Sequence, residues 1–440
     1  MEEIQLESEQ RKANFKTFII IWFGQNISLL GSQIVMFAII WWLTITSQSS
    51  FILGLAMFFG LGPQLIITLF AGVLVDRWSR KKIMMISDTA QAIISLGLVY
   101  FFFLGFKEIS LVLLVIMIRG FFQSFQGPAF QAIIPLMVPR KKLSRFNGWT
   151  FIATSLVTII GAPIGALLLT FWTIELILLV DVFTYLIAVI PLIFAKIPEL
   201  KPIKIEKNFR TEFKEGFIFI KNTPGLLTLL SIFTITNTFI SPLIFTLFPF
   251  FIKSVHNGNS SDLAIVLTFL NVGTLAGSLL MSFWKGFKKK SFGVVFSLFL
   301  VSCATLFIPF TSGEYWVILV GALLFIGGFF IPVANICSQT IWQQIVPDEK
   351  MGRVFSVRLV IALMASPIAN LVLGSIAEII GIIPIFVSNS LILMFVIIFA
   401  WFFTNIRKVD ENIGLQETLK TSKKPISQKE MENEEIKVIA

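Results

Sequence analysis

Ionisable and reactive side chains are scarce in this chain of 440 residues. It has one histidine, His256, and two cysteines, Cys303 and Cys337, and only 14% of its residues are charged. A lone histidine and two cysteines without CxxC spacing exclude the usual zinc, cluster and triad arrangements, so we expect no metal site and no disulfide. The sequence also lacks a G-x-x-x-x-G-K-[ST] loop and the motifs of zinc and serine hydrolases. We therefore predict no enzyme, no cofactor and no direct use of ATP.

Hydrophobic residues, by contrast, make up 56% of the chain, and 48 residues are phenylalanine. A water-soluble core could not bury this much apolar surface, whereas a bilayer can. A spanning helix needs about 20 apolar residues, and the long unbroken runs favour helices over the alternating strands of a barrel. We predict an all-α integral membrane protein with twelve transmembrane helices, near residues 17–45, 51–75, 83–105, 110–135, 147–170, 174–195, 225–252, 262–284, 292–311, 315–339, 355–379 and 383–404.

The net charge of +10 comes from lysine and arginine clusters in alternate loops between these runs. The remaining loops hold little beyond Lys107 and Lys253. Cytoplasmic loops of membrane proteins carry such an excess of basic residues. We therefore predict a multi-pass plasma-membrane protein with both termini cytoplasmic, membrane lipid as a partner of the basic residues, and no nucleic-acid partner. The clusters lie at residues 77–82, 140–145, 196–221, 285–290 and 350–353.

The chain repeats weakly at a fixed offset. Gly120-Phe121-Phe122 recurs as Gly328-Phe329-Phe330, an offset of 208 residues (328 − 120), and Val138-Pro139 recurs as Val346-Pro347 at the same offset. Such duplication is typical of secondary transporters, which build a midplane site between two halves. We predict two pseudo-symmetric six-helix halves, with the divisions 1–16 (cytoplasmic segment), 17–195 (N-terminal half), 196–224 (linker), 225–405 (C-terminal half) and 406–440 (cytoplasmic tail).

The linker between the halves contains an amphipathic pattern. Phe209, Phe213, Phe217 and Ile220 recur at helical spacing, and basic residues take the other faces. Such a helix either lies on the inner membrane surface or packs on the cytoplasmic face of the protein itself. The sequence leaves both alternatives open.

The segment after the second predicted span, Gly72-Val-Leu-Val-Asp-Arg-Trp-Ser-Arg-Lys-Lys82, carries an ordered motif. Glycine lets two helices approach closely, and an acid at a membrane boundary needs a partner such as a helix N-terminus. The segment resembles the signature G-x-L-A-D-R-x-G-R-K of the major facilitator superfamily. The resemblance implies the superfamily's twelve-helix fold and a gating latch that stabilises the outward-facing state, formed here by Gly72, Asp76, Arg77, Arg80 and Lys81.

The whole span from the first to the twelfth predicted helix resembles the macrolide-efflux branch of that superfamily, near the enterobactin exporters. The resemblance implies that the first, fourth, seventh and tenth helices form the wall of a substrate cavity. Its marks include Gly24-Gln25 with Ser28-Leu29, Ile118-Arg119, Pro128-Ala129, Ile197-Pro198 and Gly352-Arg353-Val354-Phe355-Ser356.

Arg119 is the most informative single residue. It lies nine residues beyond Ser110 in the fourth span, about 14 Å deep in a core of roughly 30 Å, where a charge needs a partner or a cavity. It matches the superfamily's fourth-helix arginine, which the resemblance implicates in proton coupling; the alternative is a structural arginine bound to carbonyl groups. Asp181 has a matching depth, and Asp88 lies about 9 Å from the cytoplasmic end of its span, so both are candidate proton carriers. Three further acids, expected in water at helix ends, are Glu175, Glu314 and Glu378.

Polar side chains also follow helical spacing along the predicted cavity helices. They are candidates for contact with a substrate, and the alternative for each is an interhelical hydrogen bond. The candidates are Gln25, Ser28 and Ser32 in the first span, Gln123 and Gln126 in the fourth, Thr234, Asn237 and Ser241 in the seventh, and Asn335 in the tenth.

Small residues mark the fifth predicted span. Gly161, Pro163 and Gly165 partly match the antiporter motif G-P-x-x-G-G of the superfamily. We expect these residues to allow close contact between the halves, and the motif favours export over uptake.

Together these features predict a monomeric secondary transporter that exports small hydrophobic or amphipathic molecules of the drug and macrolide kind. We expect alternating access and proton antiport, driven by the proton gradient. Two alternatives remain open. The same scaffold could export a siderophore, lipid or metabolite, or it could serve as a membrane sensor that transports nothing.

Overall fold

The computed structural model describes residues 2–139, 142–195, 197, 209–284 and 286–413, without the side chains of residues 2–14, 68–77, 135, 144, 209, 210 and 348. These residues form helices without strands, and twelve helices are long and apolar enough to cross a membrane. The predicted all-α fold with twelve spans is confirmed. The predicted tail beyond residue 413 and most of the linker (196 and 198–208) lie outside the described residues.

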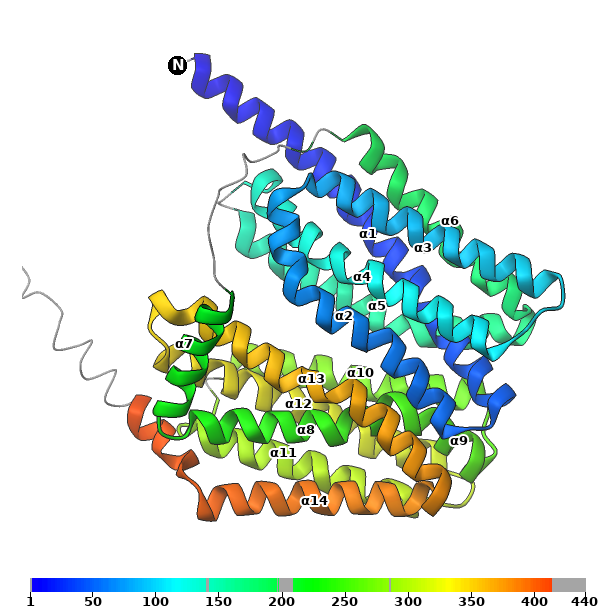
Figure 1. Ribbon diagram of the computed structural model, residues 1–440, viewed down its shortest axis with the longest axis vertical. Coiled ribbons are helices and arrows are strands. Elements are labelled where there is room, and N and C mark those ends of the chain that lie inside the picture. Colours follow the sequence, from blue (N-terminus) through cyan, green and yellow to red (C-terminus); the bar gives the residue numbers. More distant parts are fainter. Residues whose placement is uncertain (1, 140–141, 196, 198–208, 285, 414–440) are drawn as a thin grey trace, which may run out of the picture.

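Six spans form the N-terminal half, coloured blue to green in Figure 1. Ser47 ends the first helix and the second begins at Ser50, so the two are joined by a very short turn in which Gln48 has a φ of 50°. The helices of this half are α1 (Glu2–Ser47), α2 (Ser50–Arg77), α3 (Arg80–Phe103), α4 (Ile109–Met137), α5 (Leu143–Phe171) and α6 (Ile174–Phe194).

The C-terminal half begins after α7 (Phe209–Asn222), and Gly381, with a φ of 91°, permits the tight turn between its last two long helices. Its helices are α8 (Leu226–Pro242), η2 (Leu243–Leu247), α9 (Phe248–His256), α10 (Ser260–Phe283), α11 (Lys290–Phe307), η3 (Ile308–Phe310), α12 (Trp316–Ile345), α13 (Asp348–Ile380) and α14 (Ile382–Phe403), with η4 (Asn405–Arg407) after them.

The seventh span differs from its prediction as one continuous helix. It consists of α8, the π-helical turn η2 and α9. Pro249 lacks an N–H group, and its ring would clash with the carbonyl four residues earlier, which lies within η2. The widened turn accommodates this proline.

Glycines set the closest helix contacts inside each half. A Cβ atom on Gly120 of α4 would lie 2.4 Å from the carbonyl oxygen of Gly60 on α2. A Cβ atom on Gly328 of α12 would lie 2.2 Å from the carbonyl oxygen of Leu270 on α10. Gly120 and Gly328 are the residues paired by the 208-residue repeat, so the two halves use the repeated glycine in the same way.

The two halves meet near one end of the bundle, called here the far end, which holds the α1–α2 and α13–α14 turns. There a Cβ atom on Gly54 of α2 would lie 2.5 Å from the carbonyl oxygen of Asn370 on α13, and Ser50 Oγ donates to the Gly374 carbonyl at 2.8 Å. Asn271 of α10 donates to the Thr158 carbonyl of α5 at 3.3 Å. From these contacts the halves diverge toward the opposite end, the linker end, where α7 lies (Figure 1).

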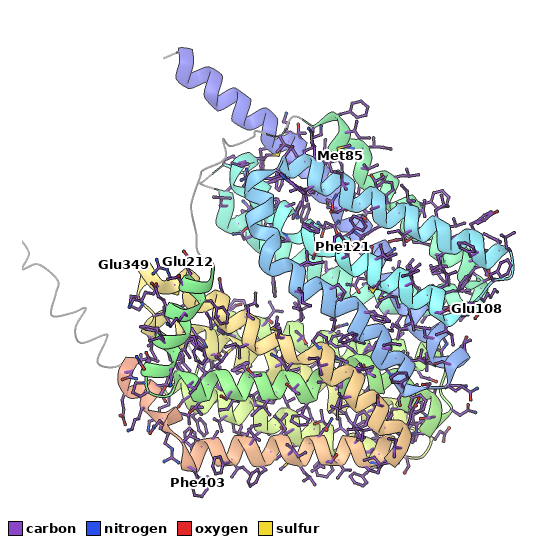
Figure 2. All side chains as sticks on the ribbon, viewed as in Figure 1. Met85, Glu108, Phe121, Glu212, Glu349 and Phe403 are labelled. Carbon is purple, nitrogen blue, oxygen red and sulfur yellow. The ribbon has the colours of Figure 1, made fainter. Side chains whose placement is uncertain are left out.

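Figure 2 shows charged side chains at both ends, with Glu212 and Glu349 at the linker end and Glu108 at the far end. At the linker end α7 packs on α13. Ile220 is fully buried, and a Cβ atom on Gly216 would lie 2.8 Å from the Arg353 carbonyl oxygen. The amphipathic segment is therefore a helix packed on the protein's own surface, which decides between the two alternatives.

Candidate functional site

A buried ion pair joins α4 to α6 in the N-terminal half. The guanidinium of Arg119 contacts the carboxylate of Asp181, and the two side chains are only 15% and 6% exposed. Ser32 of α1 and Ser95 of α3 each donate a 2.8 Å hydrogen bond to the same carboxylate. Arg119 also contacts the Ser95 hydroxyl. Four helices therefore meet at one carboxylate, and two charges that would be costly alone in a membrane interior are paired.

A second buried carboxylate lies closer to the linker end of the same half. Both oxygens of Asp88 on α3 accept hydrogen bonds from side-chain amides, at 2.9 Å from Gln25 Nε2 of α1 and at 2.7 Å from Gln126 Nε2 of α4. Gln126 Nε2 also lies 3.1 Å from Gln25 Oε1. The structure thus joins two predicted cavity residues to a predicted coupling acid. Asp88 is held by neutral donors, whereas Asp181 is held by an arginine.

Two cavities are lined by the partners of these acids. One, of about 330 Å³, lies among α1, α2, α3 and α4, and Arg119, Ser32 and Gln123 form part of its wall. The other, of about 160 Å³, lies among α1, α4 and α5, and its wall includes Gln25, Gln123 and Gln126. Aliphatic side chains such as Met36 fill much of the remaining wall. The first and fourth spans thus provide cavity walls, with polar groups set into an apolar surface.

Predicted cavity residues of the C-terminal half mostly bond to neighbouring helices. Asn237 Nδ2 of α8 donates to the Ala362 carbonyl of α13 at 3.0 Å, and Thr234 Oγ1 donates to the Leu230 carbonyl of its own helix at 2.9 Å. Ser241 accepts hydrogen bonds from two side chains of α13. Asn335 of α12 is exposed, and Ser28 of α1 is buried.

The predicted gating motif is only partly visible. Gly72, Asp76 and Arg77 lie at the end of α2, where side chains are outside the described residues, and Arg80 opens α3. Lys81 Nζ donates to the carbonyls of Ile193 and Ala195 at 2.6 and 2.8 Å. Lys81 therefore binds the carbonyl groups that end α6, a contact within the N-terminal half.

Of the acids expected in water at helix ends, Glu378 is exposed as predicted, whereas the prediction for Glu175 is wrong. Glu175 is buried and pairs with Lys107, because the loop after α3 places that lysine above the start of α6. Glu378 at the end of α13 reaches across to the N-terminal half, where it contacts the Ser49 hydroxyl and accepts from the Phe51 N–H at 3.2 Å. Such a position at the N-terminus of α2 is favourable for an anion.

The glycines of the fifth span also have a different partner from the one expected. A Cβ atom on Gly161 would lie 2.8 Å from Gln33 Cβ, and one on Gly165 would lie 2.9 Å from Phe37 Cδ1. Both contacts are to α1 of the same half. Only Pro163 of the motif faces the other half, in the α5–α10 interface.

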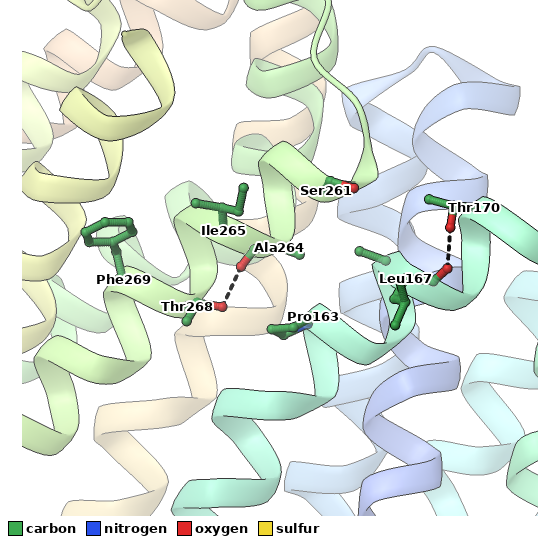
Figure 3. A pocket seen from close by; sticks show the side chains of 9 residues that line it. Pro163, Leu167, Thr170, Ser261, Ala264, Ile265, Thr268 and Phe269 are labelled. Atoms are coloured by element: carbon green, nitrogen blue, oxygen red, sulfur yellow. Dashed lines mark hydrogen bonds between the residues drawn. The ribbon is translucent and has the colours of Figure 1, made fainter.

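That interface contains a largely apolar pocket of about 400 Å³ (Figure 3). Thr170 and Thr268 line it, but their hydroxyls donate to carbonyls of their own helices, at 2.6 Å to Leu167 and 2.7 Å to Ala264. The pocket thus offers an apolar contact surface and few free polar groups that could bind a ligand.

Sequence reasoning missed two polar residues of the interior. Ser95 bridges Arg119 and Asp181; it is seven residues beyond Asp88 on the same helix, a helical spacing that could have placed it. Arg358 of α13 lies within a spanning segment, and its Nη1 donates to Gln339 Oε1 of α12 at 2.6 Å. It falls within the predicted span 355–379, and its position inside an apolar run could have identified it.

Comparison with known proteins agrees with this architecture. The chain matches the Major Facilitator Superfamily over residues 21–359 and again over residues 243–433. It is 29% identical over 398 residues to macrolide efflux protein A of Streptococcus pyogenes, covering 89% of this chain and 97% of that protein. It is 28% identical over 365 residues to the putative bacilysin exporter BacE of Bacillus subtilis, covering 79% and 85%.

Among solved structures, a bacterial homologue of the iron transporter ferroportin in an inward-facing state aligns with a TM-score of 0.64 at 14% identity, covering 87% of this chain and 98% of that one. The fold and the relatives are those of a transporter and not of an enzyme. The chain is a multi-pass membrane protein and belongs to the major facilitator superfamily.

Proposed function

We propose that this transporter exports small hydrophobic or amphipathic compounds by alternating access, in exchange for protons. The observation that carries the proposal is the buried Arg119–Asp181 pair, whose arginine also forms part of the wall of a 330 Å³ cavity. The similarity to macrolide efflux protein A and to a putative bacilysin exporter supports outward transport of small organic molecules.

The geometry suggests how one acid couples to cargo. A proton that binds Asp181 neutralises the carboxylate and removes its attraction for Arg119, which is then left beside the cavity. When the proton leaves, the carboxylate again takes the guanidinium together with the Ser32 and Ser95 hydroxyls. If these two stages open to opposite sides of the membrane, one proton moves inward as cargo moves outward.

The divergence of the halves toward the linker end supports an assignment of the state in the proposed cycle. Basic clusters are typical of cytoplasmic loops, which supports a cytoplasmic linker end. On that orientation, a bundle closed at the far end and divergent at the linker end corresponds to an inward-facing state. In this state the cargo loads from the cytoplasm or the inner leaflet. The predicted gating motif, at the linker end of α2, then acts in the opposite state.

The test uses the purified chain in liposomes with an imposed pH gradient and a panel of labelled macrolides and lipophilic compounds. Asp181→Asn is expected to abolish gradient-driven accumulation while retaining exchange of cargo for cargo, because exchange needs no net proton transfer. Arg353→Gln serves as the matched control, since Arg353 is an exposed arginine outside the cavity. Gradient-driven flux that survives in both Asp181→Asn and Arg119→Gln would refute the coupling.

A further inference from the structure

Arg358 is a cation whose partners leave much of its hydrogen-bonding capacity unused. Its Nη1 donates to Gln339 Oε1 at 2.6 Å, and its Nη2 lies 3.5 Å from Ser338 Oγ. The guanidinium lies over the rings of Trp342 and Phe355, 5.4 and 5.5 Å from their centres. Among the side chains that the structure describes, no carboxylate pairs with it. A guanidinium has five N–H groups in a planar fork that matches a carboxylate or phosphate.

The internal repeat relates this arginine to a residue on a cavity wall of the N-terminal half. Subtracting the 208-residue offset relates Arg358 to Thr150 and Gln339 to Gln131. Thr150 and Gln131 both line the 160 Å³ cavity of the N-terminal half. Arg358 and Gln339 therefore occupy, in the C-terminal half, the positions that bound a cavity in its partner half.

The side chains around Gln339 show which way this wall faces. Asn335, Gln339 and Gln343 follow one another at four-residue spacing on α12, and the first and last of them are exposed. Amide groups on one stripe of a spanning helix are costly against lipid, so the stripe faces the space between the halves. The Arg358 guanidinium lies against Trp342, which is only 1% exposed, so one side of the guanidinium is held by the protein interior.

We propose that Arg358 and Gln339 bind the anionic group of an amphipathic cargo molecule, a carboxylate in the first instance. This inference rests on the proposed export function and adds the charge of the preferred cargo. The carboxylate takes the free side of the guanidinium fork, while Gln339 keeps the remaining N–H in place. Phe355, half-buried at the edge of the site, offers an apolar surface for the body of the cargo. The site lies toward the linker end, where cargo enters in this state.

The experiment measures binding and needs no transport. Purified full-length chain in nanodiscs of phosphatidylcholine is titrated with N-dansyl-leucine and with N-dansyl-leucinamide, which share a body and differ in the carboxylate. We expect the acid to bind more tightly than the amide. Arg358→Gln should weaken binding of the acid by roughly 10- to 100-fold, the effect of one charge-assisted hydrogen bond, and leave the amide unchanged. Arg358→Lys, which keeps the charge without the fork, should restore part of the selectivity.

Arg353→Gln is the matched control and should bind both probes as the parent chain does, because Arg353 pairs with Glu215 on the surface. Thermal unfolding of each variant separates loss of fold from loss of recognition. Equal affinity for both probes, binding of neither, or an equal loss for both in Arg358→Gln would overturn the site. If phosphatidylglycerol displaces the acid from the parent chain but not from Arg358→Gln, the anion belongs to lipid and the cargo assignment fails. Absence of proton-driven flux, by contrast, would refute the export function without touching this result.

Discussion

The buried Arg119–Asp181 pair allows a quantitative prediction of how its variants change the free energy of unfolding. Arg119→Gln leaves a buried carboxylate with only two serine hydroxyls, and Asp181→Asn leaves a buried guanidinium beside Ser95. Removing one member of a buried pair costs about 3–5 kcal/mol, because the other charge stays buried without compensation. The double variant carries neither charge, so its loss should be smaller than the sum of the two single losses by at least about 2 kcal/mol.

The assay is equilibrium unfolding of the purified chain in mixed detergent micelles, followed by tryptophan fluorescence. Each variant gives a free energy of unfolding, and the four proteins complete a double-mutant cycle. The same cycle on Arg353 and Glu215, whose side chains are 41% and 52% exposed at a separation of 2.5 Å, is the control. An exposed pair should couple by less than about 1 kcal/mol. If the losses of unfolding free energy in Arg119→Gln and Asp181→Asn simply add in the double variant, the prediction is wrong, because additivity means that the two charges do not stabilise each other.

Two further predictions concern helix contacts. Gly328→Ala should lower the free energy of unfolding by about 1–3 kcal/mol, because its Cβ would lie 2.2 Å from a backbone oxygen of α10. The control is the neighbouring Gly327→Ala, which has nothing within 4 Å of its Cβ position and should not destabilise the protein. Equal losses of stability in the two variants would contradict the close contact of α12 with α10. Glu378→Gln should lower the ratio of the far-end-closed to the far-end-open state about two- to fivefold, since an acid at a helix N-terminus contributes about 0.3–1 kcal/mol. Spin-label distances between the halves at the far end report that ratio, and an unchanged distribution would remove Glu378 from the closure.

The spans were predictable because each is encoded locally. A run of about 20 apolar residues forms a spanning helix whatever its neighbours are, so all twelve predicted spans are present. The depth of a residue in the membrane was also predictable, since a residue count along a helix gives its distance from the membrane surface. Arg119 and Asp181 have matching depths, and the structure places them in contact.

Partners on other helices were not predictable in the same way. The glycines at 161 and 165 were expected at the interface between the halves and instead pack on α1, because a small residue does not specify its neighbour. Glu175 was expected in water, but a loop lysine from a distant part of the chain covers it. The role of Ser95 was not predicted, although it shares a helix face with Asp88, because a serine in a spanning helix usually forms a hydrogen bond with its own backbone. The π-turn in the seventh span depended on how Pro249 is accommodated.

Proton movement in reconstituted liposomes shows whether protons are exchanged for cargo. Liposomes containing the purified chain enclose a pH-sensitive dye, start without a pH gradient, and are loaded with a transported compound that is then diluted outside. We expect outward flow of cargo to drive protons inward and acidify the lumen, and Asp181→Asn to remove this acidification. Cargo efflux without any change in lumenal pH, or with alkalinisation of the lumen, would contradict it.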